Sequence, residues 1–483
     1  MDEMSSASFK WWLALGASMK IVNAAARLDN LPISRFHRRV IWLVGLGMFF
    51  DSFDNTLAGS VLASLLQSGY STLELNSMFL SATFIGLAIG AALAGWMSDR
   101  FGRGFAFQFN LALFGILALC CSLAPSMPWL IAIRGLQGVG MGAEYVMCYG
   151  LITEFFPPHK RGRYLGMLGI FAGAGVSMTS LISMWVIPAF SWRAMFIIAG
   201  IGTLIVWWLR RSLPESPRWL ESRGRYDEAE AVMQKIETEA GVTSPAPDAV
   251  PVSVSATPGY AAPAKWVPIT VLLTRKVFPR TLMAIILAVT CLFGSYSVTG
   301  WMPTFFVSQG MTISKSLGFN AAMMAGYVAG PLLCMFIGDR IGRRWGIVMF
   351  GTLCAIMAGI YPFMATPTFV LICGFFLVAM VASFLVLSLG ATPEFFPTAY
   401  RFRGGGVAQT CGRLGLIVSP FVVLGLFNNY GIGGVIGAIS GMYIFVTLLM
   451  IFAGNLTKPI PVDAPKDSEA DAKVDHSPAT VMK

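Results

Sequence analysis

Charged residues are scarce in this chain of 483 residues, and histidine is almost absent. Only 12% of the residues are Asp, Glu, Lys or Arg, whereas soluble domains carry about 25%. The three histidines lie outside the apolar stretches, and no nucleotide-binding, zinc-protease or nucleophile-elbow motif occurs. The eight cysteines lack metal-ligand spacing. These shortages argue against a soluble protein and against an enzyme, and we expect no catalytic residue, metal site or cofactor.

Apolar residues, in contrast, make up 56% of the chain, and the mean hydropathy is +0.69. They are gathered in runs of about 18 to 26 residues, long enough for a helix to cross a bilayer. The sequence therefore predicts an all-α membrane protein with transmembrane helices at 40–66, 77–97, 105–124, 128–152, 164–187, 193–210, 281–306, 317–338, 346–365, 368–392, 403–426 and 433–454.

The placement of the positive charges predicts the orientation in the membrane. Lys and Arg outnumber Asp and Glu by 34 to 24, but all except Arg134, Arg193, Lys315 and Arg413 fall in alternate segments. Those segments are the two tails and every second loop, which is the positive-inside pattern. We therefore expect the bilayer as partner and cytoplasmic termini, and no nucleic-acid binding.

An internal repeat divides the chain into two halves. Asp-Arg-Phe-Gly-Arg at 99–103 recurs as Asp-Arg-Ile-Gly-Arg at 339–343, and Glu-Phe-Phe-Pro at 154–157 recurs at 394–397, both displaced by 240 residues. Two motifs with one displacement indicate two six-helix halves of common ancestry.

The segments outside the two halves differ from them in composition. A helix is expected at Tyr226–Ala240, followed by a flexible tract rich in Pro, Ala and Ser. The predicted division is a cytoplasmic N-terminal segment (1–39), a first bundle (40–210), a cytoplasmic linker (211–280), a second bundle (281–454) and a disordered cytoplasmic tail (455–483).

Two motifs resemble the major facilitator superfamily of secondary transporters. They are the loop motif at 95–103 and Pro-Glu-Ser-Pro-Arg-Trp-Leu at 214–220. The resemblance implies twelve helices in two six-helix halves, a monomer, and alternating access of a small-molecule substrate. The sugar-porter Pro-Glu-Thr-Lys signature is replaced by Asn-Leu-Thr-Lys at 455–458, which weakens a sugar assignment.

Within that superfamily, four segments resemble bacterial metabolite:proton symporters, including nicotinate and aromatic-acid transporters. They are Asp-Ser-Phe-Asp at 51–54, Gly-Ala-Glu at 142–144, Gly-Trp-Met-Pro at 300–303 and Gly-Arg-Leu-Gly at 412–415. The resemblance implies protons as the coupling ion, a bacterial inner membrane, and a solute such as nicotinate.

Two buried charges are predicted to meet at one depth. Asp54 lies about 21 Å above the cytoplasmic end of the first span, and Arg134 lies about 9 Å below the outer end of the fourth span. In a bilayer core of about 30 Å these are similar heights. Resemblance to proton-driven sugar porters implies that Asp54 takes the proton and that Arg134 is its partner. The alternative is a permanently ionised structural pair.

Two further carboxylates are candidates for proton coupling. Asp51 lies on the same helical face as Asp54, and two close carboxylates in a low dielectric seldom both ionise. A polar contact to a neighbouring helix is the alternative. Glu144 is a candidate proton or cation site, and a role as a conformational gate is the alternative.

Arg413 is the one cation that we place inside a span of the second half. There its guanidinium could bind the carboxylate of an organic anion through two parallel hydrogen bonds. The alternative is helix–helix hydrogen bonding. Candidate stacking rings and orienting amides complete the expected binding site: Trp301, Tyr296, Tyr145, Tyr149, Phe53, Gln137 and Gln409.

A further set of charges lies at the ends of the spans. The family resemblance implies that they form interlocking gates: Asp99, Arg103, Glu154, Arg161, Asp339, Arg343, Glu394 and Arg401.

Several functions stay open at this point. An organic-acid symporter leads, ahead of a sugar or polyol symporter, an organic-cation carrier, a multidrug exporter and a transporter-like sensor. Uptake versus export, the proton stoichiometry and the identity of the solute are not fixed by the sequence.

Overall fold

The computed structural model describes residues 22–242, 269–275, 277–364, 366–396 and 401–452, and within them it is built from helices, with no strand. The first half holds α3 (Arg35–Gln67), α4 (Leu73–Phe101), α5 (Arg103–Ser122), α6 (Met127–Phe155), α7 (Pro158–Ala189) and α8 (Trp192–Arg210). The second half holds α11 (Phe278–Ser308), α12 (Ile313–Met324), α13 (Gly326–Ile341), α14 (Arg343–Ile360), α15 (Pro367–Ala391) and α16 (Arg401–Phe452).

These helices account for the predicted number of spans. Within the described residues, nine helical stretches are long and apolar enough to cross a membrane, and α12 and α13 together form one of them. The α16 stretch is two spans in sequence, because Gly431 breaks it with φ 64° and ψ −161°. The two remaining helices of spanning length are α3 and α6, which carry the buried residues Asp51, Asp54, Arg134 and Glu144. Twelve spans in two halves result, as the sequence predicts.

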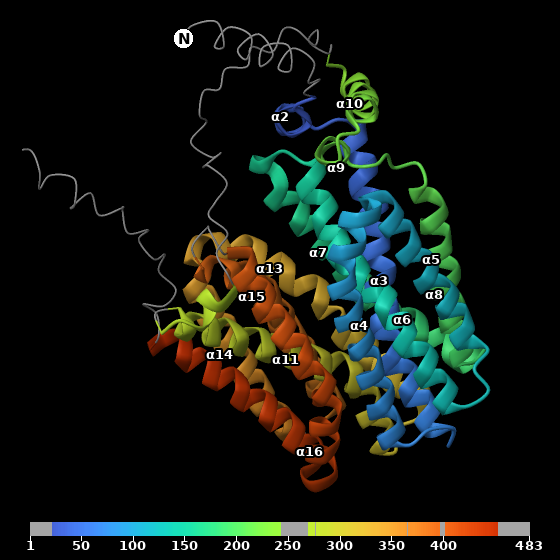
Figure 1. The fold of residues 1–483 in the computed structure, drawn as a ribbon. Coiled ribbons are helices and arrows are strands. Elements are labelled where there is room, and N and C mark those ends of the chain that lie inside the picture. The colour runs from blue at the N-terminus through green and yellow to red at the C-terminus, as the bar shows by residue number, and fades with distance from the viewer. Residues whose placement is uncertain (1–21, 243–268, 276, 365, 397–400, 453–483) are drawn as a thin grey trace, which may run out of the picture.

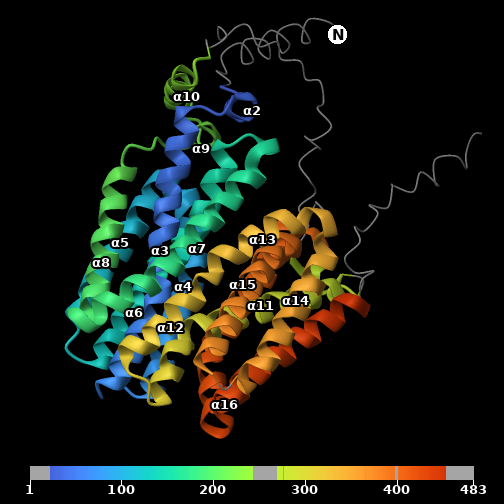
Figure 2. The same cartoon turned by 180° about the vertical axis from the view of Figure 1, so that it is seen from behind.

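The two halves stand side by side, blue to green and yellow to red in Figure 1, and Figure 2 shows the reverse side. Ser77 and Ser81 of α4 donate to backbone oxygens of α16. Ser177 of α7 donates to the Met324 oxygen, and Asn320 of α12 donates to Ser180. These contacts lie near the start of α4 and in the second part of α7. The halves are thus held together at the end remote from the short helices α2 (Ala24–Asn30), α9 (Pro217–Ser222) and α10 (Tyr226–Ala240) (Figure 1).

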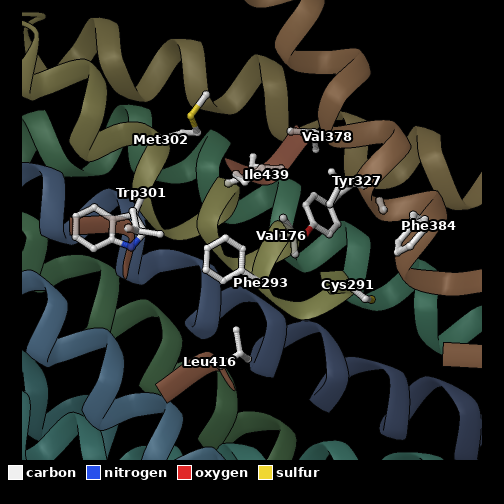
Figure 3. Close-up of a cluster of buried hydrophobic side chains, with 14 of the residues drawn as sticks. Val176, Cys291, Phe293, Trp301, Met302, Tyr327, Val378, Phe384, Leu416 and Ile439 are labelled. Carbon is white, nitrogen blue, oxygen red and sulfur yellow. The ribbon is translucent and has the colours of Figure 1, made fainter. Parts of the chain in front are cut away.

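Close packing inside the first half depends on small residues. A Cβ on Gly138 of α6 would lie 2.5 Å from the backbone oxygen of Thr83 on α4, so only glycine fits. The glycine-rich run that begins at Gly138 is therefore a helix-packing surface. A large buried apolar cluster fills the second half and the interface, with Phe293, Trp301 and Tyr327 among its members (Figure 3).

Three short helices cover one end of the first half: α2 (Ala24–Asn30), α9 (Pro217–Ser222) and α10 (Tyr226–Ala240), called here the cap. The expected helix at Tyr226–Ala240 is present. Arg27 of α2 hydrogen-bonds Glu237 and Glu230 of α10, and these carboxylates raise the pKa of Arg27. The same Arg27 contact lowers the pKa of Glu230. The 455–483 tail and nearly all of the Pro/Ala/Ser tract lie outside the described residues.

Candidate functional site

A central cavity of about 180 Å³ lies between the two halves. The first half contributes residues of α3, α4, α6 and α7, and the second contributes residues of α11, α13, α15 and α16. Small residues of α7, such as Gly169, Ala172 and Gly173, leave room for it. A cavity of about 150 Å³ is enough to hold a benzene ring. The space therefore suits a solute with a single ring.

The cavity wall carries one side chain of each charge. Asp51 comes from α3 and Arg413 from α16, so they belong to different halves. Among the described residues, Arg413 has no hydrogen-bond or ion-pair partner, and its guanidinium lies 5.8 Å from the centre of the Tyr145 ring. The Asp51 Oδ1 atom is buried without a hydrogen-bond partner in that same part of the chain. Both side chains line the cavity, so each can meet a solute there.

Predicted rings and an amide complete the cavity wall. Tyr145 and Tyr149, one helical turn apart on α6, have ring centres 5.0 Å apart. Tyr296 of α11 also lines the cavity, and its hydroxyl accepts a hydrogen bond from Asn55 at 2.9 Å, across the two halves. Gln409 lies one turn before Arg413 on α16. These side chains give a solute apolar faces to stack on and polar atoms at their edges.

Three predicted binding residues lie outside the cavity wall in this conformation. Trp301 is buried (Figure 3), and it stacks on Phe305 with ring centres 5.6 Å apart. Phe53 is buried in the apolar core. Gln137 accepts a hydrogen bond from Arg134 at 2.9 Å. Their binding roles stay predictions.

Asp54 and Arg134 form a fully buried ion pair, as the depth argument predicts. Arg134 also donates to the Asp54 backbone oxygen at 2.8 Å, and its guanidinium lies over the rings of Phe79 and Phe196. Neither charged side chain is among the residues that line the cavity. The geometry fits a lock between α3 and α6, and a proton-coupling role stays a prediction.

Glu144 has a partner that the sequence reasoning missed. Arg210, the last residue of α8, is fully buried and donates to the Glu144 carboxylate at 2.8 Å. It also donates to the backbone oxygens of Leu43 and Val44 on α3 at 2.7 and 2.9 Å. Arg210 therefore ties three helices together. The sequence reasoning counted Arg210 among the cations of the cytoplasmic linker, because it is the last residue of its span.

The cavity residues Ser52, Asn55 and Thr56 were also missed by the sequence reasoning. A signal for one of them was present, because Asn55 follows Asp51 by four residues and so shares its helical face.

The predicted gate charges are described in part. Arg103 donates to Glu154 at 2.8 Å, which links α5 to the end of α6. Glu215, from the 214–220 motif, accepts the backbone N–H groups of Arg103 and Gly104 at 2.9 to 3.1 Å. Arg161 donates to Asp29 of the cap at 3.1 Å.

One of the other five predicted gate residues has a described side chain. Arg343 begins α14. Four side chains lie outside the described set: Asp99, Asp339, Glu394 and Arg401. Gating roles stay predictions for all eight residues. Within the described residues, no cluster of His, Cys, Asp and Glu is arranged to hold a metal ion.

This chain is similar in sequence and fold to known membrane transport proteins. The inner membrane metabolite transport protein YdjE of Escherichia coli (strain K12) is 32% identical over 451 residues, covering 91% of this chain and 97% of the relative. The niacin transporter NiaP of Acinetobacter baylyi is 31% identical over 406 residues, covering 83% and 90%. A crystal structure of a D-xylose-proton symporter matches the fold with a TM-score of 0.68 at 19% identity, covering 86% of this chain and 97% of that one.

The model of one family matches both halves, over residues 44–326 and 317–480. It is a family of membrane transporters, which agrees with the helical spans, the two halves and the shared cavity. The chain belongs to the Major Facilitator Superfamily.

Proposed function

We propose that this protein is a proton-coupled symporter of a small aromatic or heteroaromatic monocarboxylate, with nicotinate as the leading example. It works by alternating access in a bacterial inner membrane, with both termini cytoplasmic. The similarity to a niacin transporter supports this substrate class. The positive-inside pattern of the loops supports the orientation.

One observation carries the proposal: the Arg413 guanidinium, which has no hydrogen-bond or ion-pair partner in the described part of the chain, lines a cavity of single-ring size. Placing a cation within a membrane-spanning segment costs free energy, so such a residue usually has an ionic partner or a function. Arg413 offers a planar, bidentate fork to a carboxylate. Tyr145, Tyr149 and Tyr296 offer ring faces at the same place. A planar ring with one carboxylate matches both features.

The carboxylates of α3 supply candidate proton sites. Asp54 is held by Arg134, so its ionisation depends on whether that ion pair stays closed during the transport cycle. Asp51 faces the cavity, through which a proton can reach it. We assign proton coupling to this pair of carboxylates and name Asp54 as the first residue to test.

Uptake by vesicles that contain the purified protein tests the proposal. One proton moving with one monoanion carries no net charge, so an inward proton gradient should drive accumulation of labelled nicotinate. A potassium–valinomycin potential alone should not drive it, because voltage acts only on net charge, by about 2.3 kcal/mol per charge per 100 mV.

The same vesicles discriminate against the alternatives. Strong voltage dependence would favour a cation or a neutral sugar moving with a proton. Competition by hexoses but not by aromatic acids would also contradict the proposal. Arg413→Gln vesicles serve as the matched control, because they keep the fold of the cavity and lack its cation.

A further inference from the structure

Helix α7 packs on the second half along only part of its length. At the end remote from the cap, Ser180 accepts a hydrogen bond from Asn320 of α12 at 3.0 Å. Nearer the cap, a Cβ on Gly173 would lie 2.7 Å from the backbone oxygen of Tyr327 on α13. The hydrogen bond from Ser177 to α12 lies between these two contacts. The helices therefore approach each other closely at Gly173, where this contact ends.

These contacts define an antiparallel register between the two helices. Seven residues separate the first contact from the last on α7, and seven residues separate them on α12 and α13. The pairing thus stays in step over about two turns. Continued toward the cap, the same register pairs Gly169 with Pro331 and Gly166 with Cys334.

Gly162, Gly166 and Gly169 continue the packed face of α7 toward the cap and are called here the open face. At about 100° per residue, each points within about 40° of the direction of Gly173. A Cβ added to any of the three would have no atom of another element within 4 Å among the described residues. Gly169 and Pro331 both line the cavity, so the open face adjoins it. Glycine weakens a helix interior relative to alanine, so three glycines without a contact in this conformation indicate a contact in another one.

The partner helix leaves α7 at a break. Because α12 ends at Met324 and α13 begins at Gly326, Ala325 interrupts the helix where the contact with α7 ends. Beyond the break α13 packs closely on α15, since a Cβ on Gly326 would lie 2.6 Å from the backbone oxygen of Phe375. In Figures 1 and 2 the cap end of α7 stands apart from α13.

We propose that α13 docks on the open face of α7 when the cap ends of the two halves come together. The glycines then allow the two backbones to touch, as small residues do between helices in membranes. Contact between Gly169 and Pro331 closes the cavity at this end. The inference rests on the alternating access of the proposed function, and it does not depend on which solute is carried.

A disulfide trap tests the docking on the full chain in lipid nanodiscs without any solute. In Gly166→Cys the added thiol meets Cys334 when α13 docks, so oxidation with copper–phenanthroline should join the helices. In the present conformation no atom of Cys334 lies within 4 Å of the added Cβ, whereas the Cβ atoms of a disulfide lie about 3.8 Å apart. A protease site placed between residues 243 and 268 reports the bond, because the cleaved halves stay joined until a reductant is added.

Two controls make the trap specific. Adding Cys334→Ser should abolish the bond, and Gly150→Cys, at an equally open glycine of α6, should not form it. Absence of the bond in Gly166→Cys, or an equal yield in Gly150→Cys, would overturn the inference. Bond formation in a chain that does not take up nicotinate would leave the docking intact and reject the proposed function.

A bulky residue on the open face gives the complementary test. Gly166→Leu fits the present conformation, where its Cβ meets no other element, but it overpacks the docked one. Ser81 is buried against α16, so Ser81→Cys should react with a hydrophilic maleimide only when the ends remote from the cap separate. Gly166→Leu should slow that reaction at least about tenfold, and Gly437→Leu, at an equally open glycine of α16, by less than about twofold. Equal rates in the two variants would overturn the inference.

Discussion

Replacement of Arg210 by methionine removes the centre of a buried contact between three helices. The guanidinium binds the Glu144 carboxylate at 2.8 Å and the Leu43 and Val44 oxygens of α3, and it lies 4.0 Å from the centre of the Phe107 ring. Methionine keeps much of the apolar contact and removes every hydrogen bond. Glu144 is left as an unpaired carboxylate in a fully buried position.

The size of the effect follows from that unpaired charge. Breaking a buried ion pair by removing one partner costs about 3–5 kcal/mol, because the remaining charge keeps its desolvation penalty. We expect Arg210→Met to lower the free energy of unfolding by that amount. Adding Glu144→Gln removes the unpaired charge. The double variant should therefore be more stable than the sum of the single effects by more than about 0.5 kcal/mol.

Equilibrium unfolding in mixed micelles measures these differences. Arg211→Met is the matched control, since Arg211 is exposed next to Arg210 and its guanidinium lies over the Trp207 ring. That control should change stability by less than about 0.5 kcal/mol, as surface substitutions do. A small effect of Arg210→Met, or strictly additive effects in the double variant, would refute the view that the pair braces the first half.

Three further predictions concern function and the cap. Asp54→Asn should abolish uphill uptake driven by a proton gradient while solute exchange at equal pH survives; unchanged uphill uptake would remove Asp54 as the proton site. Arg413→Gln should weaken nicotinate binding by about 1.5–3 kcal/mol and the neutral amide much less; equal losses in titrations of acid and amide would assign Arg413 to helix packing. Arg27 lowers the pKa of Glu230 in the folded state. The contact therefore stabilises the cap at pH values above the ordinary glutamate pKa, and this stabilisation is lost as the pH falls through the lowered pKa. Hydrogen exchange of the α2 amides should rise over that range, with a flatter response in Glu230→Gln than in the surface control Glu228→Gln; identical responses would exclude Glu230.

The fold was largely predictable because the sequence patterns that specify it extend over many residues. Runs of apolar residues long enough to cross a bilayer predict the spans, and a repeat displaced by 240 residues predicts the halves. The helices extend several residues past the predicted spans: α3 begins at Arg35, whereas the predicted span begins at residue 40. Charged residues end an apolar run but not a helix, so hydropathy underestimates the length of helices that project from the membrane.

The site was predictable in part, for a different reason. Depth along a helix follows from counting residues, and it placed Asp54 opposite Arg134. The direction in which a side chain points depends on helix rotation and tilt, which no count supplies. Phe53 lies between the cavity residues Ser52 and Asn55 in sequence, yet it packs into the core. Arg210 was missed because a cation at the end of a span resembles every other cation of a basic loop.

Two ion pairs are fully buried among the residues that the structure describes, and they distinguish the two halves. They use Asp54, Arg134, Glu144 and Arg210, all in the first half. The residues 240 positions further on are Gly294, Gly374, Phe384 and Met450, none of which ionises. The first copy of the repeat is therefore braced by ion pairs at these positions, and the second copy holds apolar residues at the matching ones. Helices of the second copy can slide at these positions without separating opposite charges. We therefore expect the helix packing of the first copy to stay fixed during transport, and the helices of the second copy to shift around the bound solute.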